Sequence, residues 1–310
     1  MYMLRFTTLS ERSACFRAFT GLTIEEFTKL VSLIRTDWII QREERLARPD
    51  RERKEGGGAK PKLPTLEDQL LLTLVWLRLY PVYLVLEFLF GIDESTISRT
   101  VAHIRPLLQD RFTLPERLPK KKIRSLEELK KFLPDDVSLD EVLVDATEQK
   151  IHRPQTKRKR KPYHSGKKRT FTVKTQLTTT RSGVPIHVSQ TVGGRQHDYK
   201  LFQHSGLPRI LPPDMQMYGD GGYQGAKKDY PDLDMFLPFK RHRGHLQLTH
   251  SEKIRNKKQR RVRIKIENTI AQLKTFKVLA DSYRHSLQNY NSTFRFVTNL
   301  VAFRMLQRQT

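Results

Sequence analysis

The sequence predicts a mixed α/β protein with an all-α region in front of the mixed sheet. Apolar residues recur at helical spacing in the first third of the chain, and short alternating segments typical of strands begin near residue 141. Two further helical segments end the chain. We therefore expect a helix and a flexible basic linker over 1–62, a helix-turn-helix over 63–110, a connector over 111–140 and an α/β domain over 141–310.

The first expected helix covers residues 24–46, where apolar side chains lie three or four positions apart. A charged segment over 48–62 follows and contains Gly56-Gly57-Gly58, a composition typical of a flexible linker. It lacks the Gly-Lys-Ser/Thr ending of a phosphate-binding loop.

Residues 66–108 predict three helices separated by two turns. Pro81 breaks the first helix, and Gly91 ends the second, which Val85, Leu86, Leu89 and Phe90 mark. Asp93 or Ser95 can cap the third helix. Its apolar side carries Ile97, Val101, Ile104 and Leu108, and its opposite side carries Arg99 and His103. This order is typical of a helix-turn-helix whose last helix enters the major groove; a small bundle with a solvated polar face is the alternative.

Strand patterns begin at Glu141. Val142-Leu143-Val144 form a short strand that ends at Asp145, and the segments 170–180 and 184–192, joined at Ser182-Gly183, predict a hairpin. The other expected elements are a short helix near 126–132, a helix over 198–204, strands over 215–218 and 235–239, and helices over 251–279 and 293–306.

The charge of the chain indicates a polyanionic partner. It contains 58 Lys and Arg against 33 Asp and Glu, a net charge of +25. DNA is the first candidate, and an anionic membrane surface is the second. No apolar run approaches the roughly 18 residues of a spanning helix, no signal peptide is visible, and no helix pairs a cationic face with a clean apolar one, so we expect a protein of the cytosol or nucleoid. Cys15 is the only cysteine, which excludes an internal disulfide and a cysteine zinc site.

Three acidic residues stand out in this basic chain. Asp145 follows a strand, at the edge of the sheet where α/β proteins place their sites, and Asp220 follows another strand within Gly219-Asp220-Gly221-Gly222. Glu267 shares one stripe of the long helix with Arg263 and Lys274, beside the buried face. Taken singly, these residues are equally typical of a turn or cap, a tight turn, and a surface ion pair of Arg263 with Glu267.

Together these segments resemble the three motifs of DDE transposases of the bacterial insertion-sequence-five group, which are related to Harbinger-type elements. The motifs are Val144-Asp145-Ala146-Thr147-Glu148, Gly219-Asp220-Gly221-Gly222-Tyr223 and Arg263-Ile264-Lys265-Ile266-Glu267. Tyr163-His164-Ser165-Gly166-Lys167-Lys168 resembles the basic hairpin of that group, and Gln196-His197-Asp198 resembles its His-Asp element. Arg263, Glu267 and Lys274 fit the spacing of a Tyr-Arg-Glu-Lys signature whose tyrosine position is Arg260 here.

The resemblance implies a ribonuclease-H-like catalytic domain behind a helix-turn-helix. It implies that Asp145, Asp220 and Glu267 are catalytic and hold two Mg²⁺ ions, which Mn²⁺ can replace, with Asp145 bridging both. Carboxylates suit this role because Mg²⁺ prefers oxygen ligands. His197 and Asp198 are possible accessory residues that position metal or water, or simply the start of a helix.

Two basic runs supply the expected grip on DNA. Residues 152–168 hold eight Lys or Arg and no acid, and residues 240–265 hold eleven against Glu252 alone. A charge run is usually a solvated face, but these two bracket the acidic residues, and Tyr163 can stack on a base. The expected DNA contacts are Arg99, His103, Arg158, Arg160, Tyr163, Lys167, Lys168, Arg260, Arg263 and Lys274.

The resulting expectation is an enzyme that cuts DNA at the terminal inverted repeats of a mobile element and joins the ends to target DNA. Two ends must be handled together, so we expect a homodimer on DNA. Two alternatives remain at this stage. One is a DNA-binding relative without catalysis, decayed or domesticated. The other is a ribonuclease-H-like nuclease that never joins strands.

Overall fold

The computed structural model describes residues 3–47, 60–109, 111–114, 125–135, 137, 139–213, 215–241 and 247–308. The chain divides into two compact units. Unit 1 comprises residues 1–109 and 275–278, and unit 2 comprises residues 110–274 and 279–310. Most of the linker expected over 48–62 lies outside the described residues. Within the described part of the chain, no helix is both long and apolar enough to cross a membrane.

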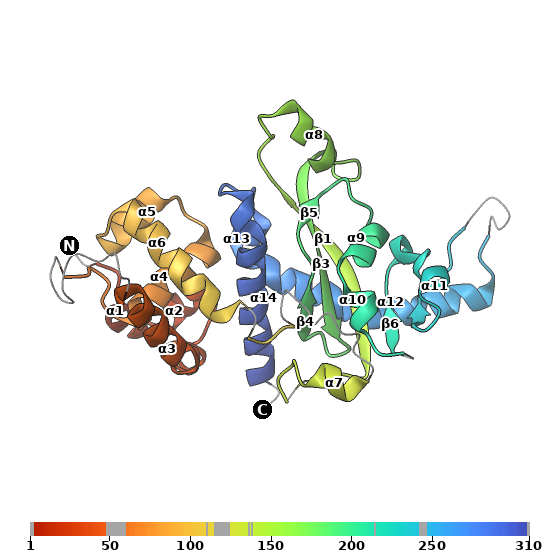
Figure 1. The fold of residues 1–310 in the computed structure, drawn as a ribbon, viewed down its shortest axis with the longest axis horizontal. Helices are drawn as coiled ribbons and strands as arrows, with labels where there is room; N and C mark the ends of the chain where they lie inside the picture. Colours follow the sequence, from red (N-terminus) through yellow and green to blue (C-terminus); the bar gives the residue numbers. More distant parts are fainter. Residues whose placement is uncertain are drawn as a thin grey trace. The chain divides into compact units, whose positions relative to one another are not determined.

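Unit 1 is entirely helical (Figure 1). The helix expected over 24–46 is confirmed, and Thr23 and Glu26 cap its first turn reciprocally. Two short helices before it were not predicted, because five to eight residues carry too little periodicity. The elements are α1 Phe6–Ser10, α2 Ser13–Thr20, α3 Ile24–Leu46, α4 Leu66–Leu79, α5 Tyr83–Phe90, α6 Glu94–Ile104 and the 3₁₀ helix η1 Arg105–Leu108.

The three-helix order over residues 66–108 is confirmed. Gly91 ends α5 at φ 66°, a left-handed conformation that favours glycine. Asp93 caps α6, and its Oδ1 accepts the Thr96 N–H at 2.9 Å. The end of α4 before Pro81, the end of α5 at Gly91 and the start of α6 after Asp93 are therefore as expected, but α6 ends at Ile104, and Leu108 lies in the 3₁₀ helix η1 that follows it.

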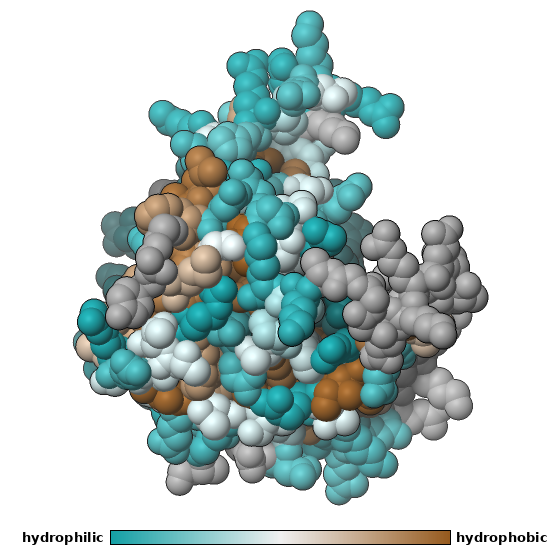
Figure 2. All heavy atoms as spheres, turned by 90° about the vertical axis from the view of Figure 1, so that its left-hand side faces the viewer, coloured by the Kyte–Doolittle hydropathy of each residue, from teal (hydrophilic) through white to brown (hydrophobic). Residues whose placement is uncertain are grey.

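Helix α5 buries a narrower face than its periodicity suggested. Leu86 and Phe90 are buried, but Val85, which we expected on the same face, is 44% exposed. Leu84 and Phe88 are exposed as well. Such apolar side chains contribute brown spheres to a largely hydrophilic surface, as on the face drawn in Figure 2. An eight-residue helix packed on one side leaves most of its circumference in water, so its sequence alone does not fix the buried arc.

Unit 2 is built on one mixed sheet, which confirms the predicted fold class. The path of the sheet is β2-β3-β1-β6-β7, and β4 and β5 also pair with β3. β1 is antiparallel to β3 and parallel to β6. The strands are β1 Glu141–Lys150, β2 His164–Ser165, β3 Thr170–Thr180, β4 Pro185–Val188, β5 Val192–Gly193, β6 Gln216–Tyr218 and β7 Asp234–Phe236.

The strand expected to end at Asp145 is longer than predicted. β1 continues through Asp145 to Lys150, because β3 pairs with it over its whole length, from Val142↔Thr180 to Lys150↔Thr172. The expected hairpin is confirmed as β3 and β4, with Gly183 at φ 96° in its turn. β1 is polar beyond Asp145, so its apolar run was shorter than the strand itself.

Helices cover the sheet of unit 2 (Figure 1). The long helix ends at Lys274 rather than 279, and the last helix begins at Tyr290. The helical segments are α7 Leu126–Lys130, α8 Lys157–Tyr163, α9 Asp198–His204, α10 Leu207–Ile210, η2 Gly221–Tyr223, α11 Ala226–Asp229, α12 His250–Lys274, η3 Leu287–Asn289 and α14 Tyr290–Gln307. The short helix α13 Lys277–Ala280 has its first two residues in unit 1 and its last two in unit 2.

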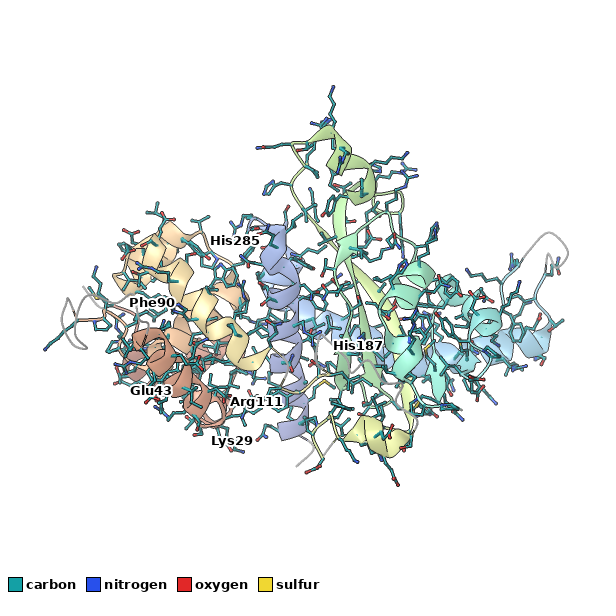
Figure 3. All side chains as sticks on the ribbon, viewed as in Figure 1. Lys29, Glu43, Phe90, Arg111, His187 and His285 are labelled. Atoms are coloured by element: carbon teal, nitrogen blue, oxygen red, sulfur yellow. The ribbon has the colours of Figure 1, made fainter. Side chains whose placement is uncertain are left out.

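Helix α14 lies in the core of unit 2 and carries a buried cation. Arg295 is 0% exposed, and its guanidinium donates to the Val188 carbonyl at 3.0 Å and the Leu114 carbonyl at 2.7 Å. His187, labelled in Figure 3, lies on β4 and is 3% exposed. Burial and the nearby Arg295 lower the pKa of His187 to about 3, so its imidazole is neutral.

Candidate active site

The sheet register places Asp145 and Asp220 next to each other. β6 pairs in parallel with the start of β1, Leu143 opposite Tyr218, and then stops. Asp145 and Asp220 each lie two residues beyond that last pair. Asp145 stays in β1, whereas Asp220 begins a tight turn in which its Oδ1 accepts the Gly222 N–H at 2.6 Å. The site thus forms at the carboxyl end of β6, where the edge of β1 is left without a partner.

The charged form of the Asp145 carboxylate is disfavoured in the folded protein. Its side chain is 20% exposed. Burial raises its pKa to about 6, and the negative charges of Asp220 and Asp198 add to the rise, while Arg263 and the Ala146 N–H oppose it. The Ala146 N–H donates to Oδ1 at 2.8 Å. A cation placed beside Asp145 would therefore relieve a strain that Arg263 compensates only in part.

Helix α12 brings the third acidic residue to the same region. Arg263 Nη2 lies 3.6 Å from Asp145 Oδ2 and 3.9 Å from Glu267 Oε1. The i, i+4 ion pair of Arg263 with Glu267, which the sequence also allowed, is therefore present. Arg263 also links α12 to β1, and it is only 17% exposed, whereas Glu267 is 52% exposed. The side chain of Glu267 can consequently turn without disturbing the core.

A cavity of about 1120 Å³ opens beside these residues. Asp145 and Glu267 line it, and Asp220 lies next to it without contributing to its wall. Two further carboxylates, Glu148 and Asp198, face the same space. The remaining wall is mostly cationic or imidazole: Arg160, Lys161, His164, Lys167, Lys168, Lys174, Arg195, His197 and Lys274. A cavity lined by both carboxylates and basic side chains suits a phosphodiester chain and the cations that accompany it.

The basic residues expected to touch DNA divide into two groups in unit 2. Arg160, Lys167, Lys168 and Lys274 line the cavity. Burial and the nearby Lys168 lower the pKa of Lys274, while Asp145 and Glu148 oppose that shift. The others lie outside the cavity wall: Arg158 and Arg260 are exposed, Tyr163 is half-buried, and Arg263 contacts the acids instead.

The segment expected as a basic hairpin contains a helix. α8 covers Lys157–Tyr163, and only His164 and Ser165 pair with β3. Arg160 secures the helix, since its guanidinium donates to the Pro154 and Gln155 carbonyls, both at 3.0 Å. Five consecutive cations disfavour a helix in isolation, which explains the missed prediction. Side chains of α8 project outward from the ribbon in Figure 3.

Asp198 of the His-Asp element lies in the acidic region, and it forms an ion pair with a lysine that was not predicted from the sequence. Asp198 begins α9, as expected, and His197 is the exposed residue before it. Asp198 Oδ1 accepts from Lys174 Nζ at 2.8 Å. The sequence signal for Lys174 is that it is the only lysine in the Thr-rich segment 170–180. A lysine is rarely buried in a strand unless it has a charged partner.

In the described residues, the acidic side chains do not form a complete metal-binding cluster. In the part of the chain that the structure describes, no three His, Cys, Asp or Glu side chains stand close enough to hold one metal ion. Glu267 is turned toward Arg263. The donor chemistry nevertheless fits hard cations, because the available ligands are carboxylate oxygens and Asp145 is buried among like charges.

The last helix of the helix-turn-helix in unit 1 presents a small polar surface. Arg99 is exposed and folds back on the start of α6, where its Nη2 donates to Ser95 Oγ at 3.0 Å. His103 is half-buried and lies against Arg45 of α3, with Nη1 2.6 Å from His103 Nδ1. Arg99 is therefore available to DNA, whereas His103 also packs within unit 1.

Comparisons with known proteins agree with this description. The family model described as "DDE superfamily endonuclease" matches residues 144–302, and the model described as "Helix-turn-helix of DDE superfamily endonuclease" matches residues 61–114. The chain is 29% identical over 289 residues to a probable transposase for insertion sequence element IS702 of Microchaete diplosiphon, covering 93% of this chain and 91% of the relative. It is 26% identical over 265 residues to a putative transposase for insertion sequence element IS112 of Streptomyces albus G, covering 85% and 84%.

No solved structure matches the chain significantly. The first family model spans slightly more than half of the 310 residues and includes Asp145, Asp220 and Glu267, and the second spans the three helices α4, α5 and α6. The fold, the order of the two regions and both matches lead to one conclusion: this chain belongs to the DDE superfamily endonucleases.

Proposed function

We propose that the protein is a transposase that cuts DNA at the ends of a mobile element and joins those ends to target DNA. The observation that supports this most directly is that Asp145 and Asp220 each lie two residues beyond the last β1–β6 pair, with Glu267 brought to the cavity that Asp145 lines by α12. The names of the two relatives point to the same activity.

The proposed catalytic residues are Asp145, Asp220 and Glu267, which would hold two Mg²⁺ ions, with Mn²⁺ as a substitute. Ions held there supply activation of the attacking water or hydroxyl and stabilisation of the leaving oxygen. To take part, the Glu267 carboxylate leaves Arg263, a rotation that its 52% exposure permits. Arg263 then remains beside Asp145, where it also faces the phosphate backbone.

The protein's own residues position the DNA. Lys167, Lys168 and Lys274 line the same cavity as Asp145 and Glu267 and bind phosphates, while Arg160 fixes α8 to the loop before it. Arg99 on α6 reads a terminal inverted repeat in the major groove. Two ends must be processed together, so the proposed working form is a homodimer on DNA. Further proposed DNA contacts are His103, Arg158, Tyr163 and Arg260, and His197 and Asp198 are proposed as accessory residues.

Strand cleavage by the purified full-length protein tests this proposal. A labelled duplex that carries one element end is incubated with Mg²⁺, and nicking is followed for the wild type, Asp145→Ala and Glu267→Gln. Both variants should lose cleavage by at least about 100-fold, because each removes a group that stabilises charge in the transition state. Glu127→Gln, an exposed carboxylate on α7, is the matched control and should cut normally. Unchanged cleavage by Asp145→Ala would refute the assigned site.

Two further measurements separate this function from its alternatives. Labelled pre-cut element ends are offered together with a supercoiled plasmid, and strand transfer is scored by covalent joining of the label to the plasmid. Cleavage without transfer would identify a nuclease. Binding to the repeat without any cleavage, in Mg²⁺ and in Mn²⁺, would identify a non-catalytic DNA-binding protein.

A further inference from the structure

A largely buried ion network of Lys174, Glu148 and Asp198 forms part of the cavity wall. Lys174, in the middle of β3, is a cation whose side chain is 9% exposed. The register places it directly opposite Glu148 on β1. A buried ammonium is costly unless its hydrogen bonds are satisfied, so the partners of Lys174 indicate what holds it in place.

The ammonium of Lys174 is satisfied from three sides. Its Nζ donates to Asp198 Oδ1 at 2.8 Å and to the Gln196 carbonyl at 2.7 Å, and it lies 3.4 Å from Glu148 Oε1. Glu148 is itself fixed, because Thr172 Oγ1 donates to its Oε2 at 2.8 Å. Two strands of the sheet thereby hold the chain at Gln196 and Asp198, immediately before and at the start of α9.

The second oxygen of Asp198 points away from this anchor and toward the proposed catalytic residues. A Cβ built on Gly222 would stand 3.2 Å from Asp198 Oδ2 and 2.8 Å from Asp220 Oδ1. The two carboxylates therefore converge on the same glycine, whose missing side chain leaves them room. The buried hydroxyl of Tyr223 lies within electrostatic reach of Asp145, Asp198 and Asp220. Burial and these three negative charges raise the pKa of Tyr223 well above its ordinary range.

We propose that Lys174 is a positioning residue that orients Asp198 so that its free oxygen serves as an additional carboxylate of the cation-binding site. This inference rests on the proposed function of that site. Lys174 does not touch the reacting atoms; it acts through Asp198. The juxtaposition of Asp198 with Asp220 and Asp145 follows from this anchor and from the close packing around it, where a Cβ on Gly194 would come within 1.7 Å of Thr172 Oγ1.

Positioning and simple charge compensation predict opposite results for the loss of Lys174. If the lysine only offset the negative charge of the cavity, its removal would leave the site more negative, and the site would bind divalent cations more tightly. If the lysine orients Asp198, its removal releases a ligand, and the affinity falls. Residues that orient metal ligands typically contribute 10–100-fold to metal affinity.

Titration of the metal-free full-length protein with Mn²⁺, followed by calorimetry in the absence of DNA, tests the inference. Lys174→Met and Asp198→Asn should each weaken Mn²⁺ binding by about 10–100-fold. The double variant should be no weaker than Asp198→Asn alone, since both changes remove the same ligand. Lys200→Met deletes an exposed lysine two residues from Asp198 on the same helix, and it should bind Mn²⁺ at least as tightly as the wild type.

Thr172→Val is a second variant that tests the same inference if the Lys174→Met protein does not fold. It leaves every charge in place, frees Glu148 and should weaken Mn²⁺ binding in the same direction by a smaller factor. The inference is overturned if Lys174→Met binds Mn²⁺ as tightly as the wild type or more tightly. Where Lys174→Met does not fold, the same result for Thr172→Val overturns it. Additive losses of Mn²⁺ affinity in the double variant overturn it as well. Wild-type cleavage is scored separately. A protein that cuts DNA but shows no Lys174 effect refutes only the positioning role, and a protein that shows the Lys174 effect but never cuts refutes only the proposed function.

Discussion

Replacement of Asp145 by asparagine should stabilise the metal-free protein while abolishing its cleavage of DNA. The charged form of this carboxyl is disfavoured in the folded state, because burial and the neighbouring Asp220 and Asp198 raise its pKa from 3.8 to about 6. An asparagine resembles the protonated acid and can keep the hydrogen bond from the Ala146 N–H. The variant therefore removes an unfavourable charge without removing the side-chain volume.

The magnitude follows from the pKa shift. Because the folded protein binds this proton more tightly than the unfolded chain, Asp145 lowers the free energy of unfolding as the pH rises from 3.8 through 6, and the whole cost is present above pH 6. One pKa unit corresponds to about 1.4 kcal/mol, so the shift amounts to about 3 kcal/mol. The side chain is 20% exposed, and water screens part of this energy, so we expect a gain of about 2 kcal/mol at pH 7.5.

The assay is urea unfolding in EDTA, followed by far-ultraviolet circular dichroism. Tryptophan fluorescence would miss the effect, since both tryptophans, Trp38 and Trp76, lie in unit 1. The gain should shrink toward zero by about pH 4, where Asp145 is protonated in the folded wild type. Excess Mg²⁺ should reverse the order of stability, because only the wild type keeps the ligand.

Asp234→Asn, an exposed carboxylate on β7 of the same sheet, is the matched control and should change stability by less than about 0.5 kcal/mol. An Asp145→Asn protein that is no more stable than the wild type at pH 7.5 without metal would refute the electrostatic reasoning. A gain that is equally large at pH 4 would refute it too, because the effect would then not come from the charge.

Three other outcomes follow from the structure. His187 is neutral in the fold, so its contribution to the free energy of unfolding is complete above pH 6.5 and falls by about 1.4 kcal/mol per pH unit as the pH drops toward 3. Hydrogen exchange of β4 amides should show this loss, and His187→Leu should lack this component while keeping the pH dependence that comes from Asp145. Arg295→Met leaves two buried carbonyls without their donor and should destabilise unit 2 by about 3 kcal/mol in chemical denaturation, whereas replacement of the exposed Arg308, the C-cap of the same helix, by Met should be nearly neutral. Arg99→Ala should weaken binding to a terminal repeat by about 10–100-fold and binding to random duplex far less, while Lys168→Gln should weaken both equally and reduce the salt slope by about one; identical losses on both DNAs for Arg99→Ala would contradict base reading.

The order of the helices and strands was predictable because it depends on local spacing and capping. Helix α3 was correct to the residue, and Gly91 and Asp93 marked the end of α5 and the start of α6. The glycines around Asp220 indicated a tight turn after a strand, which β6 and η2 form. These features are determined by residues within about four positions of one another, so the sequence carries them directly.

Properties of β1 and α8 were not predictable in the same way. β1 runs five residues past Asp145 because β3 pairs with it there, and that pairing joins residues between 22 positions (Lys150 with Thr172) and 30 positions (Ala146 with Gln176) apart in the chain. α8 forms against its own charge repulsion because Arg160 bonds to the backbone before it. In both cases a contact outside the segment outweighs the local preference.

By itself, the sequence determined which elements form, their order, the sign of the charge and three acidic candidates. Only the tertiary structure decided which side chains meet. The parallel register brings Asp145 beside Asp220, the antiparallel register sets Lys174 against Glu148, and Arg263 stands between Asp145 and Glu267. The physical reason is that periodicity along a chain fixes the face on which a side chain lies, whereas its neighbour across a sheet or a helix contact depends on how distant segments pack and where one strand stops.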